Sequence, residues 1–487
     1  MKNSIWKIRN RKFRAHFAPL SASGFLAAIV ALALCYPTMS ANAQAAPADA
    51  AAAPTKPTKA PAKLAAKNAG GAGELLEVKP EAVGFSSERL TRLESAMQTA
   101  IDQKQLAGGV TMLVRHGKIA EFKAYGMRDL ATAKPTEKDT IFRIFSMTKP
   151  VTSTAMMILY EEGKWSPEDP ISKYIPEFAQ LKVFKGVDAS GNMVTEDPGH
   201  APTMRELMTH TAGFSYGGGT TPVDKIYGEK RTLHSASLQE MIEKLAASPL
   251  LYQPGTRWVY SVSVDIQGYI VEKLSGESLP DFMREKIFQP LGMRDTGFYV
   301  PAEKMDRFAA LYRWDQQQGA LVPSSASVLG LDYLKQPTMA SGGGGLVSTA
   351  RDYSRFAQML LNGGQLGTSA AGVRILGPET VKLMSANHLP PQLMGTDVGM
   401  RFWGNVRYGF GYGYDFGVFV DPGLADSPVG KGTFMWNGAA GTWFWIDPVN
   451  DIVFVGMVQR MGGGPFVGVM EEIARSTVYQ ALVEKNP

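Results

Sequence analysis

The sequence predicts an α/β (α+β) fold: an antiparallel sheet flanked by an N-terminal and a C-terminal helix, with a mostly helical domain inserted between its strands. Two observations indicate this fold. Strand-like segments with tight turns lie near both ends of the folded region, and helical periodicity dominates between them. Strands from both ends can share one sheet if the chain ends meet. We therefore expect one domain at 77–487, with its α/β part at about 77–150 and 340–487 and the inserted helical part at about 151–339.

The segment 1–43 predicts a secretory signal peptide. Basic residues come first, an apolar run follows at 24–34, and Ala41-Asn42-Ala43 offers a small-x-small cleavage site. The apolar run is shorter than the ~20 residues of a membrane-spanning helix, which favours cleavage over retention as an anchor. We therefore expect a periplasmic or secreted protein. Cys35 is the only cysteine and lies in this segment, so the mature chain would have neither a disulfide nor a thiol nucleophile.

The segment 44–76 is rich in Ala, Pro and Lys and predicts a disordered linker. Its lysines either touch an anionic cell envelope or simply solubilise the linker; they are Lys56, Lys59, Lys63 and Lys67. Six of the 50 Lys and Arg residues leave with the signal, and the remaining 44 face 45 Asp and Glu. The basic isoelectric point of the whole chain therefore gives no indication of nucleic-acid binding. No obligate protein partner is evident.

The two ends of the domain supply the expected sheet and its flanking helices. Ser86 opens the first helix, whose apolar face carries Leu90, Leu93, Met97 and Ile101. Two strands joined by a tight turn at 116–118 follow. The expected strands are 110–115, 119–125, 433–436, 442–446 and 452–458. A last helix is expected at 466–483.

The middle of the chain predicts shorter helices at 203–214, 265–274 and 353–361, and a solvent-exposed excursion at 181–200. His210 is expected to bond backbone at the end of its helix rather than to act in catalysis. The five histidines that remain after the signal show no metal-ligand spacing, so we expect no metal and no cofactor. The glycines at 341–345 lack the Gly-Lys-Ser/Thr ending of a phosphate loop.

Ser146-Met147-Thr148-Lys149 is the candidate nucleophile segment. A β-prone run precedes it and helix formers follow it, so Ser146 would lie at the first turn of a helix. The i, i+3 spacing then puts its hydroxyl and the Lys149 ammonium on one face. Burial and positive neighbours are expected to lower the pKa of Lys149 so that it can serve as base. Taken alone, the same tetrapeptide also suits a capping serine and a solvated lysine.

Together with distant segments, this motif resembles the serine β-lactamase-like superfamily, specifically the branch with class C β-lactamases and family VIII carboxylesterases. The resemblance covers about 83–480 and includes the phrases at 207–214, 290–296 and 343–350. It implies that Ser146 is the nucleophile of an S-x-x-K motif and Lys149 its partner. It also implies that Tyr260, in the place of the Y-x-N tyrosine, exchanges protons with Ser146 and the leaving group.

Two departures from the penicillin-recognising pattern concern the substrate. Val262 replaces the asparagine of Y-x-N, and Trp436-Asn437-Gly438 replaces Lys-Thr-Gly on the strand beside the site. Losing charge-assisted recognition of a carboxylate costs about 1.5–3 kcal/mol per hydrogen bond. We place Val262, Trp436, Asn437 and Gly438 in substrate binding, with the backbone amides of Ser146 and Ala439 as the oxyanion hole. Gly438 would let the acyl group approach the strand closely.

The resemblance implies a serine hydrolase, and the departures favour a carboxylesterase that cleaves small or short-chain esters through an acyl-serine. In one alternative, the same acyl-serine chemistry cleaves amides, as in a weak β-lactamase, a D-aminopeptidase, a DD-carboxypeptidase or an oligoamide hydrolase. Another is a non-catalytic protein that binds cell-wall fragments. An acyl-enzyme trapped from a slow ester would exclude that last alternative.

Overall fold

The computed structural model describes residues 74–325, 327–328, 331–367, 372–394, 408–462 and 465–484. Residues 70–217 and 221–487 form one compact unit, and the description that follows concerns its described part. The expected signal peptide and all but the last residues of the expected linker lie outside the described residues. Within the described part, no helix is long and apolar enough to cross a lipid bilayer.

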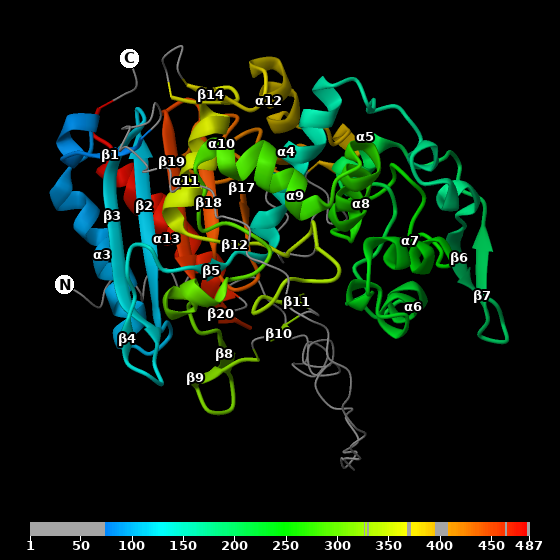
Figure 1. Ribbon diagram of the computed structural model, residues 1–487, viewed down its shortest axis with the longest axis horizontal. Coiled ribbons are helices and arrows are strands. Elements are labelled where there is room, and N and C mark those ends of the chain that lie inside the picture. Colours follow the sequence, from blue (N-terminus) through cyan, green and yellow to red (C-terminus); the bar gives the residue numbers. More distant parts are fainter. Residues whose placement is uncertain are drawn as a thin grey trace, which may run out of the picture. The chain divides into compact units, whose positions relative to one another are not determined.

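The centre of the fold is a sheet whose strands come from both ends of the described chain, as the sequence predicts (Figure 1). Strand β19 joins the two halves, because Ile452 pairs with Arg115 and Val458 with Gly109 across the antiparallel β2–β19 ladder. In order across the sheet, the strands are β1 (Leu76–Glu77), β3 (Lys118–Asp129), β2 (Gly108–Arg115), β19 (Ile452–Val458), β18 (Trp443–Asp447), β17 (Phe434–Asn437), β16 (Gly417–Phe419) and β15 (Phe410–Tyr412), with β4 (Lys134–Pro135) on β3.

Helices cover the sheet. Helix α3 (Ser87–Asp102) packs against α13 (Pro465–Ala481), so the first and last helices flank the sheet together (Figure 1). Helix α11 (Ala350–Leu361) contacts β2, β18 and β19. Its N-cap is Thr349, whose hydroxyl accepts a hydrogen bond from the Asp352 amide at 3.2 Å. The predicted arrangement of the α/β part is therefore confirmed.

The chain between the strands is mostly helical. Helix α4 (Thr148–Glu161) runs through its buried centre and packs against α8 (Ser263–Ser275). The remaining helices are α5 (Met204–Met208), α6 (Pro222–Glu229), α7 (Leu238–Ala246), α9 (Leu279–Met283), α10 (Gln289–Leu291) and α12 (Pro378–Ser385). Short paired strands lie around them: β5 (Phe142–Arg143), β8 (Tyr312–Asp315), β9 (Ala320–Pro323), β10 (Ser327–Val328), β11 (Leu331–Asp332), β12 (Val347–Ser348), β13 (Gln365–Leu366), β14 (Val373–Arg374) and β20 (Arg460–Met461).

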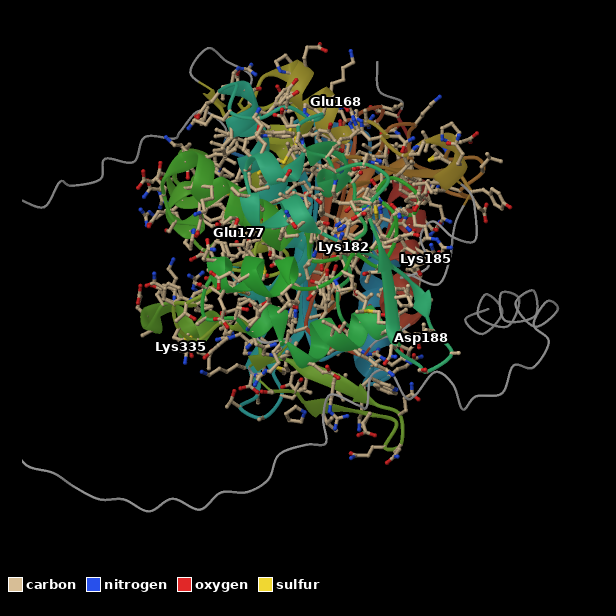
Figure 2. All side chains as sticks on the ribbon, turned by 90° about the vertical axis from the view of Figure 1, so that its right-hand side faces the viewer. Glu168, Glu177, Lys182, Lys185, Asp188 and Lys335 are labelled. Atoms are coloured by element: carbon tan, nitrogen blue, oxygen red, sulfur yellow. The ribbon has the colours of Figure 1, made fainter. Side chains whose placement is uncertain are left out.

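The stretch at 181–200 is a largely exposed excursion, as expected, and it contains a hairpin of β6 (Val183–Val187) and β7 (Met193–Glu196). Figure 2 shows the hairpin with Lys185 and Asp188 labelled. Asp188 makes the turn, because its Oδ1 accepts hydrogen bonds from the amides of Ser190 and Asn192, both at 2.8 Å. The turn residues were recognisable in the sequence, whereas the alternation of the flanking strands was too weak to read.

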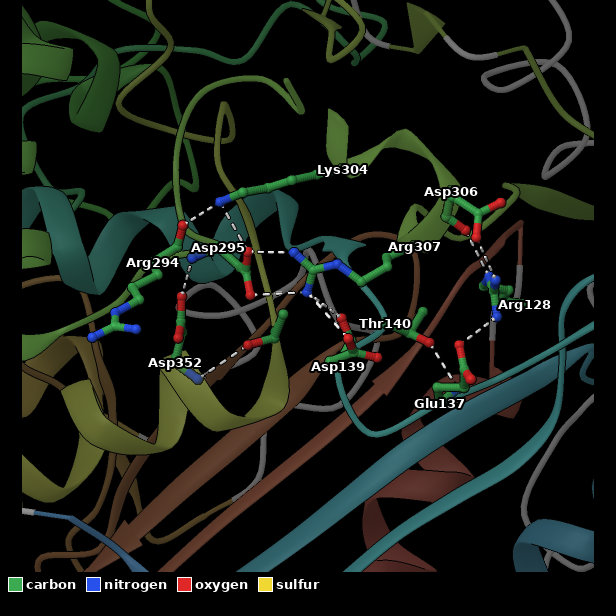
Figure 3. A network of polar contacts seen from close by, with 11 residues as sticks. Arg128, Glu137, Asp139, Thr140, Arg294, Asp295, Lys304, Asp306, Arg307 and Asp352 are labelled. Carbon is green, nitrogen blue, oxygen red and sulfur yellow. Dashed lines mark hydrogen bonds and ion pairs between the residues drawn. The ribbon is translucent and has the colours of Figure 1, made fainter. Parts of the chain in front are cut away.

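A network of ion pairs fixes the segment that follows α10 (Figure 3). Asp295 binds Arg307 at 2.6 Å and Lys304 at 2.9 Å, and its amide donates to Asp352 Oδ2 at 2.7 Å. Arg128 forms a second ion pair of the network, with Glu137 at 2.9 Å. The Asp352 contact joins this segment to the start of α11, which follows β12. The network therefore braces the start of α11, which lies shortly after the glycine-rich segment described below.

The buried carboxyl of Glu121 on β3 is expected to make stability depend on pH. Burial raises its pKa from 4.5 to about 7, against the charge of Lys123. The folded state binds this proton more tightly than the unfolded state, so Glu121 destabilises the fold as pH rises from about 4.5 through 7. At high pH, the ionised carboxyl lowers the free energy of unfolding by an amount of order 3 kcal/mol. Glu121→Gln should therefore raise the free energy of unfolding at pH 8 and change it little at pH 4.5.

Urea unfolding of both proteins at the two pH values measures this difference. Glu229→Gln, at an exposed position on α6, is the matched control and should leave the pH dependence of the native protein in place. An equal gain for Glu121→Gln at both pH values would contradict the assignment, because the benefit would then come from packing rather than from the proton.

Candidate active site

Ser146 lies where a short strand turns into helix α4. Strand β5 pairs with β12, and a 3-10 turn at Phe145–Met147 links it to α4. Phe145 has a φ of 42°, in the left-handed region that costs a non-glycine residue about 1–3 kcal/mol. Its buried ring packs edge-on against Tyr333 with centroids 5.7 Å apart, which helps to hold this conformation. The bend leaves Ser146 partly exposed beside residues that are buried.

Lys149 is fully buried one turn further on, on the same side of the helix as Ser146. Its Nζ lies 3.4 Å from Ser146 Oγ and donates to the carbonyl oxygen of Gly343 at 2.6 Å. The same atom lies 4.6 Å from the ring centroid of Tyr260 and 5.6 Å from that of Tyr216. The expected proximity of the hydroxyl and the ammonium is therefore present, and the rest of the lysine head faces aromatic rings and a carbonyl group.

The expected downward shift of the Lys149 pKa is wrong. Burial alone lowers it, but electrostatic interactions with Tyr216, Tyr260 and Asp265 and a hydrogen bond with Tyr260 outweigh burial and raise the pKa above the ordinary value. The groups that act on Lys149 in the described part of the chain are phenols and a carboxyl group, not the cations that the sequence interpretation assumed. Lys149 is therefore a cation at neutral pH.

The structure brings Tyr260 to Lys149 from a segment more than a hundred residues away in sequence. Its ring is stacked on Tyr216, with an interplanar angle of 7° and centroids 5.4 Å apart. The indole of Trp436 lies 5.6 Å from it on another side. Tyr260 is only 5% exposed, so its hydroxyl is held by packing rather than by solvent. Residues 257–261, which carry Tyr260, lie outside any helix or strand.

Asp265 and Tyr216 belong to the site and were missed in the sequence. Asp265 is fully buried at the start of α8, and its Oδ1 accepts from Ser341 Oγ at 2.5 Å and from the Gly343 amide at 3.1 Å. It thus fixes the loop whose carbonyl caps Lys149. Burial raises the pKa of Asp265, while the Lys149 cation opposes that shift. An acidic residue in the first turn after the tyrosine segment was the available signal, but it also suits an ordinary helix start.

A small cavity opens at Ser146. It is lined by Phe145, Ser146, Tyr216, Leu233, Leu331, Ser341, Gly343, Gly344 and Ala439. Two of the glycines come from the segment that was tested as a phosphate loop, and they form the wall of this cavity instead. The lining shows that Ser146 and Ala439 face the same space, as a shared oxyanion hole requires. Leucine and phenylalanine side chains make much of the remaining wall apolar.

The residues expected to bind substrate take different positions. Val262 is buried and its amide donates to the Ser215 carbonyl at 3.2 Å. Trp436 faces Tyr260, but the Asn437 side chain donates to Glu471 on α13 at 3.2 Å, across the sheet. Successive side chains on a strand alternate between faces, so Asn437 offers the site only its backbone.

Gly438 is needed for a reason other than the one expected. A Cβ atom there would clash with the Ile144 carbonyl oxygen and with Thr442 Oγ1. The residue is therefore small because the backbone leading to Ser146 packs directly against it. The same close packing brings the turn that carries Ala439 next to the nucleophile segment.

Comparisons with known proteins show which family the chain is similar to. The family model described as Beta-lactamase matches residues 93–479. Esterase EstB of Burkholderia gladioli is 30% identical over 367 residues, which cover 72% of this chain and 86% of the esterase. An uncharacterized protein of Mycobacterium tuberculosis is 36% identical over 373 residues, 75% of this chain and 89% of that protein. The solved structure of EstCE1, described as a hydrolase with promiscuous acyltransferase activity, has a TM-score of 0.65 at 27% identity and covers 80% of this chain and 98% of its own.

Proposed function

Since the chain belongs to the beta-lactamase family of serine hydrolases, we propose that it is a carboxylesterase that cleaves small or short-chain esters through an acyl-Ser146 intermediate. The observation that carries the ester assignment is the position of Trp436, whose indole lies 5.6 Å from the Tyr260 ring where a carboxylate-binding cation would otherwise stand. An apolar acyl group fits a cavity walled by Leu233 and Leu331. The similarity to esterase EstB supports the same substrate class.

The proposed reaction begins when Ser146 Oγ attacks the ester carbonyl carbon. Lys149 carries its proton at neutral pH and cannot accept another, so the proposed base is the phenolate form of Tyr260 beside that cation. Its oxygen takes the Ser146 proton and becomes a neutral phenol. The backbone amides of Ser146 and Ala439 donate to the carbonyl oxygen as it becomes negative. Tyr260 then protonates the leaving alcohol as the bond between the carbonyl carbon and the alcohol oxygen breaks. Water then attacks the acyl-enzyme through the same steps of attack and proton transfer, and the acid is released.

A substrate panel tests the ester assignment. We expect p-nitrophenyl acetate and butyrate to be hydrolysed with a kcat/KM at least about a hundredfold above that for nitrocefin or D-alanyl amides. The reason is that, in the described part of the site, the indole of Trp436 stands where a cation would bind the carboxylate of a β-lactam. A longer ester, such as the laurate, should react poorly because the leucines close the cavity. Amide or β-lactam turnover above ester turnover would favour the amide-directed alternative.

A matched pair of variants ties the panel to the structure. Leu233→Ala should extend the acceptable acyl chain, because Leu233 lines the cavity at Ser146. Leu238→Ala, at a buried position on the neighbouring helix α7, removes the same atoms away from the cavity and should leave the chain-length preference unchanged. If both variants show the same acyl-chain preference, the acyl group does not bind in the cavity beside Leu233.

Acyl transfer is a second candidate function. The similarity to EstCE1, described as a hydrolase with promiscuous acyltransferase activity, favours it. An apolar wall around Ser146 also favours an alcohol over water as the second substrate. The measurement is the yield of transesterified product when a vinyl ester and a small alcohol are supplied together. If the free acid is the product and no transesterified ester forms, the protein is a hydrolase and not an acyltransferase.

The proposed location is the periplasm or the cell exterior, because the N-terminal segment has the composition of a cleavable signal. The intact mass of protein recovered from the expressing cell would show a chain beginning near Gln44. A mass that includes the first 43 residues would indicate a retained anchor.

A further inference from the structure

His210 holds the two residues on either side of Tyr260. It follows α5 with a φ of 57°, and its carbonyl oxygen accepts the Val259 amide at 2.9 Å. Its ring Nδ1 accepts the Ser261 amide at 3.2 Å and lies 3.1 Å from Ser261 Oγ. One residue thus bonds the backbone before and after Tyr260, in a segment outside any sheet. The expected backbone bonding of His210 is present, and its target is the tyrosine segment.

The protonation of His210 follows from these contacts. An amide can only donate, so Nδ1 carries no proton and the hydrogen of the neutral ring is on Nε2. Burial, and then the charge of Lys149, holds the pKa of His210 well below its ordinary value, so the ring stays neutral at neutral pH. His210 therefore accepts the Ser261 amide throughout the working pH range.

The imidazole is also part of the packing around Tyr260. Its centroid lies 5.0 Å from that of Tyr260, 5.9 Å from Trp258 and 5.7 Å from Tyr412. Nε2 lies 3.7 Å from Oδ1 of Asp415, and both side chains are fully buried. Asp415 bonds back to α5 through its amide, which donates to the Met208 carbonyl at 3.2 Å. The ring therefore cannot turn without disturbing the aromatic cluster or the segment at Asp415.

We propose that His210 is a positioning residue that sets the place of the Tyr260 hydroxyl by fixing the backbone on both sides of it. This inference rests on the proposed function, because it assigns His210 a part in the same reaction. Tyr260 is bordered by packed rings, so its hydroxyl moves with its backbone. A shift of about 1 Å at a proton-transferring group can cost on the order of 100-fold in rate. In the described part of the chain, the hydrogen bonds of His210 go to the neighbours of Tyr260 and not to Ser146 or Lys149, so we assign its effect on the reaction to the position of Tyr260.

A double-mutant cycle with Tyr260→Phe tests this route, using the full chain and p-nitrophenyl acetate. His210→Leu should lower kcat on the order of 100-fold in the native background, with KM nearly unchanged. In the Tyr260→Phe background, the same change should cost less than about threefold, since the hydroxyl that it displaces is already gone. His210→Asn should recover most of the activity, because its Oδ1 can accept the Ser261 amide from nearly the position of Nδ1.

Three outcomes would overturn the proposal: an equal loss in both backgrounds, an Asn variant no better than Leu, or an unchanged kcat in His210→Leu. If His210→Leu does not fold, the comparison of His210→Asn with His210→Gln decides, because Gln places its acceptor one methylene too far. His388→Leu is the matched control: that ring lies 2.8 Å from the Leu383 carbonyl and stacks on Tyr414, away from Tyr260, and its loss should leave kcat near native. Activity that does not require Ser146 would overturn the proposed function as well, whereas Ser146-dependent activity with an additive cycle would overturn this inference alone.

Discussion

Ser146→Ala is expected to lower hydrolysis of p-nitrophenyl acetate and butyrate by at least about 10⁴-fold, with the melting temperature close to that of the native protein. Within the described residues, the hydroxyl has one side-chain hydrogen bond, at 3.4 Å from Lys149 Nζ, so its loss removes the nucleophile and little of the packing. No acyl adduct should appear in the intact mass of the variant after exposure to a slow ester. The native protein should gain the mass of one acyl group.

Ser153→Ala is the matched control, because Ser153 lies on the same helix and its hydroxyl donates to the Tyr414 carbonyl at 2.9 Å. It should retain most of the activity and lose some stability. Turnover that survives Ser146→Ala would remove the assigned mechanism. A native protein that neither turns over esters nor forms an acyl adduct would support the alternative of a binding protein without catalysis.

The local parts of the site were readable because they depend on spacing along one helix. Ser146 and Lys149 are three residues apart, and helix geometry brings them together regardless of the rest of the chain. The terminal strands were also predictable, since short runs rich in apolar residues and bounded by turns marked most of them. For Tyr260, only the resemblance to a family linked the residue to Lys149, because no local pattern specifies a contact over that distance in sequence.

The electrostatic part of the prediction failed for the same reason. The sign of the Lys149 pKa shift depends on which groups surround its ammonium, and Tyr216, Tyr260 and Asp265 all come from distant segments. These residues can be read from the sequence, but their convergence around Lys149 cannot. The side-chain direction of Asn437 is a similar case, because a shift of one residue in strand register would have exchanged its face with that of Trp436.

Replacing Lys149 is the second change for which we expect a large effect. Lys149→Met keeps the volume but removes the charge beside Tyr260, and should lower kcat/KM on the order of 10³-fold. Lys149→Arg keeps a permanent cation that can still donate to the Gly343 carbonyl. Since the pKa of Lys149 is raised rather than lowered, its work requires the charge and not the loss of a proton. The arginine variant should therefore be at least about tenfold more active than the methionine variant, despite its larger head.

The measurement is kcat/KM for p-nitrophenyl acetate between pH 6 and 9, with melting temperatures for each variant. Lys164→Met, at the exposed end beyond α4, is the control and should behave like the native protein. If both Lys149 variants fold and arginine is no better than methionine, the lysine must give up its proton during the reaction. The base would then be the amine that the sequence alone suggests, and the phenols and the carboxyl group around it would serve to place it rather than to keep it charged.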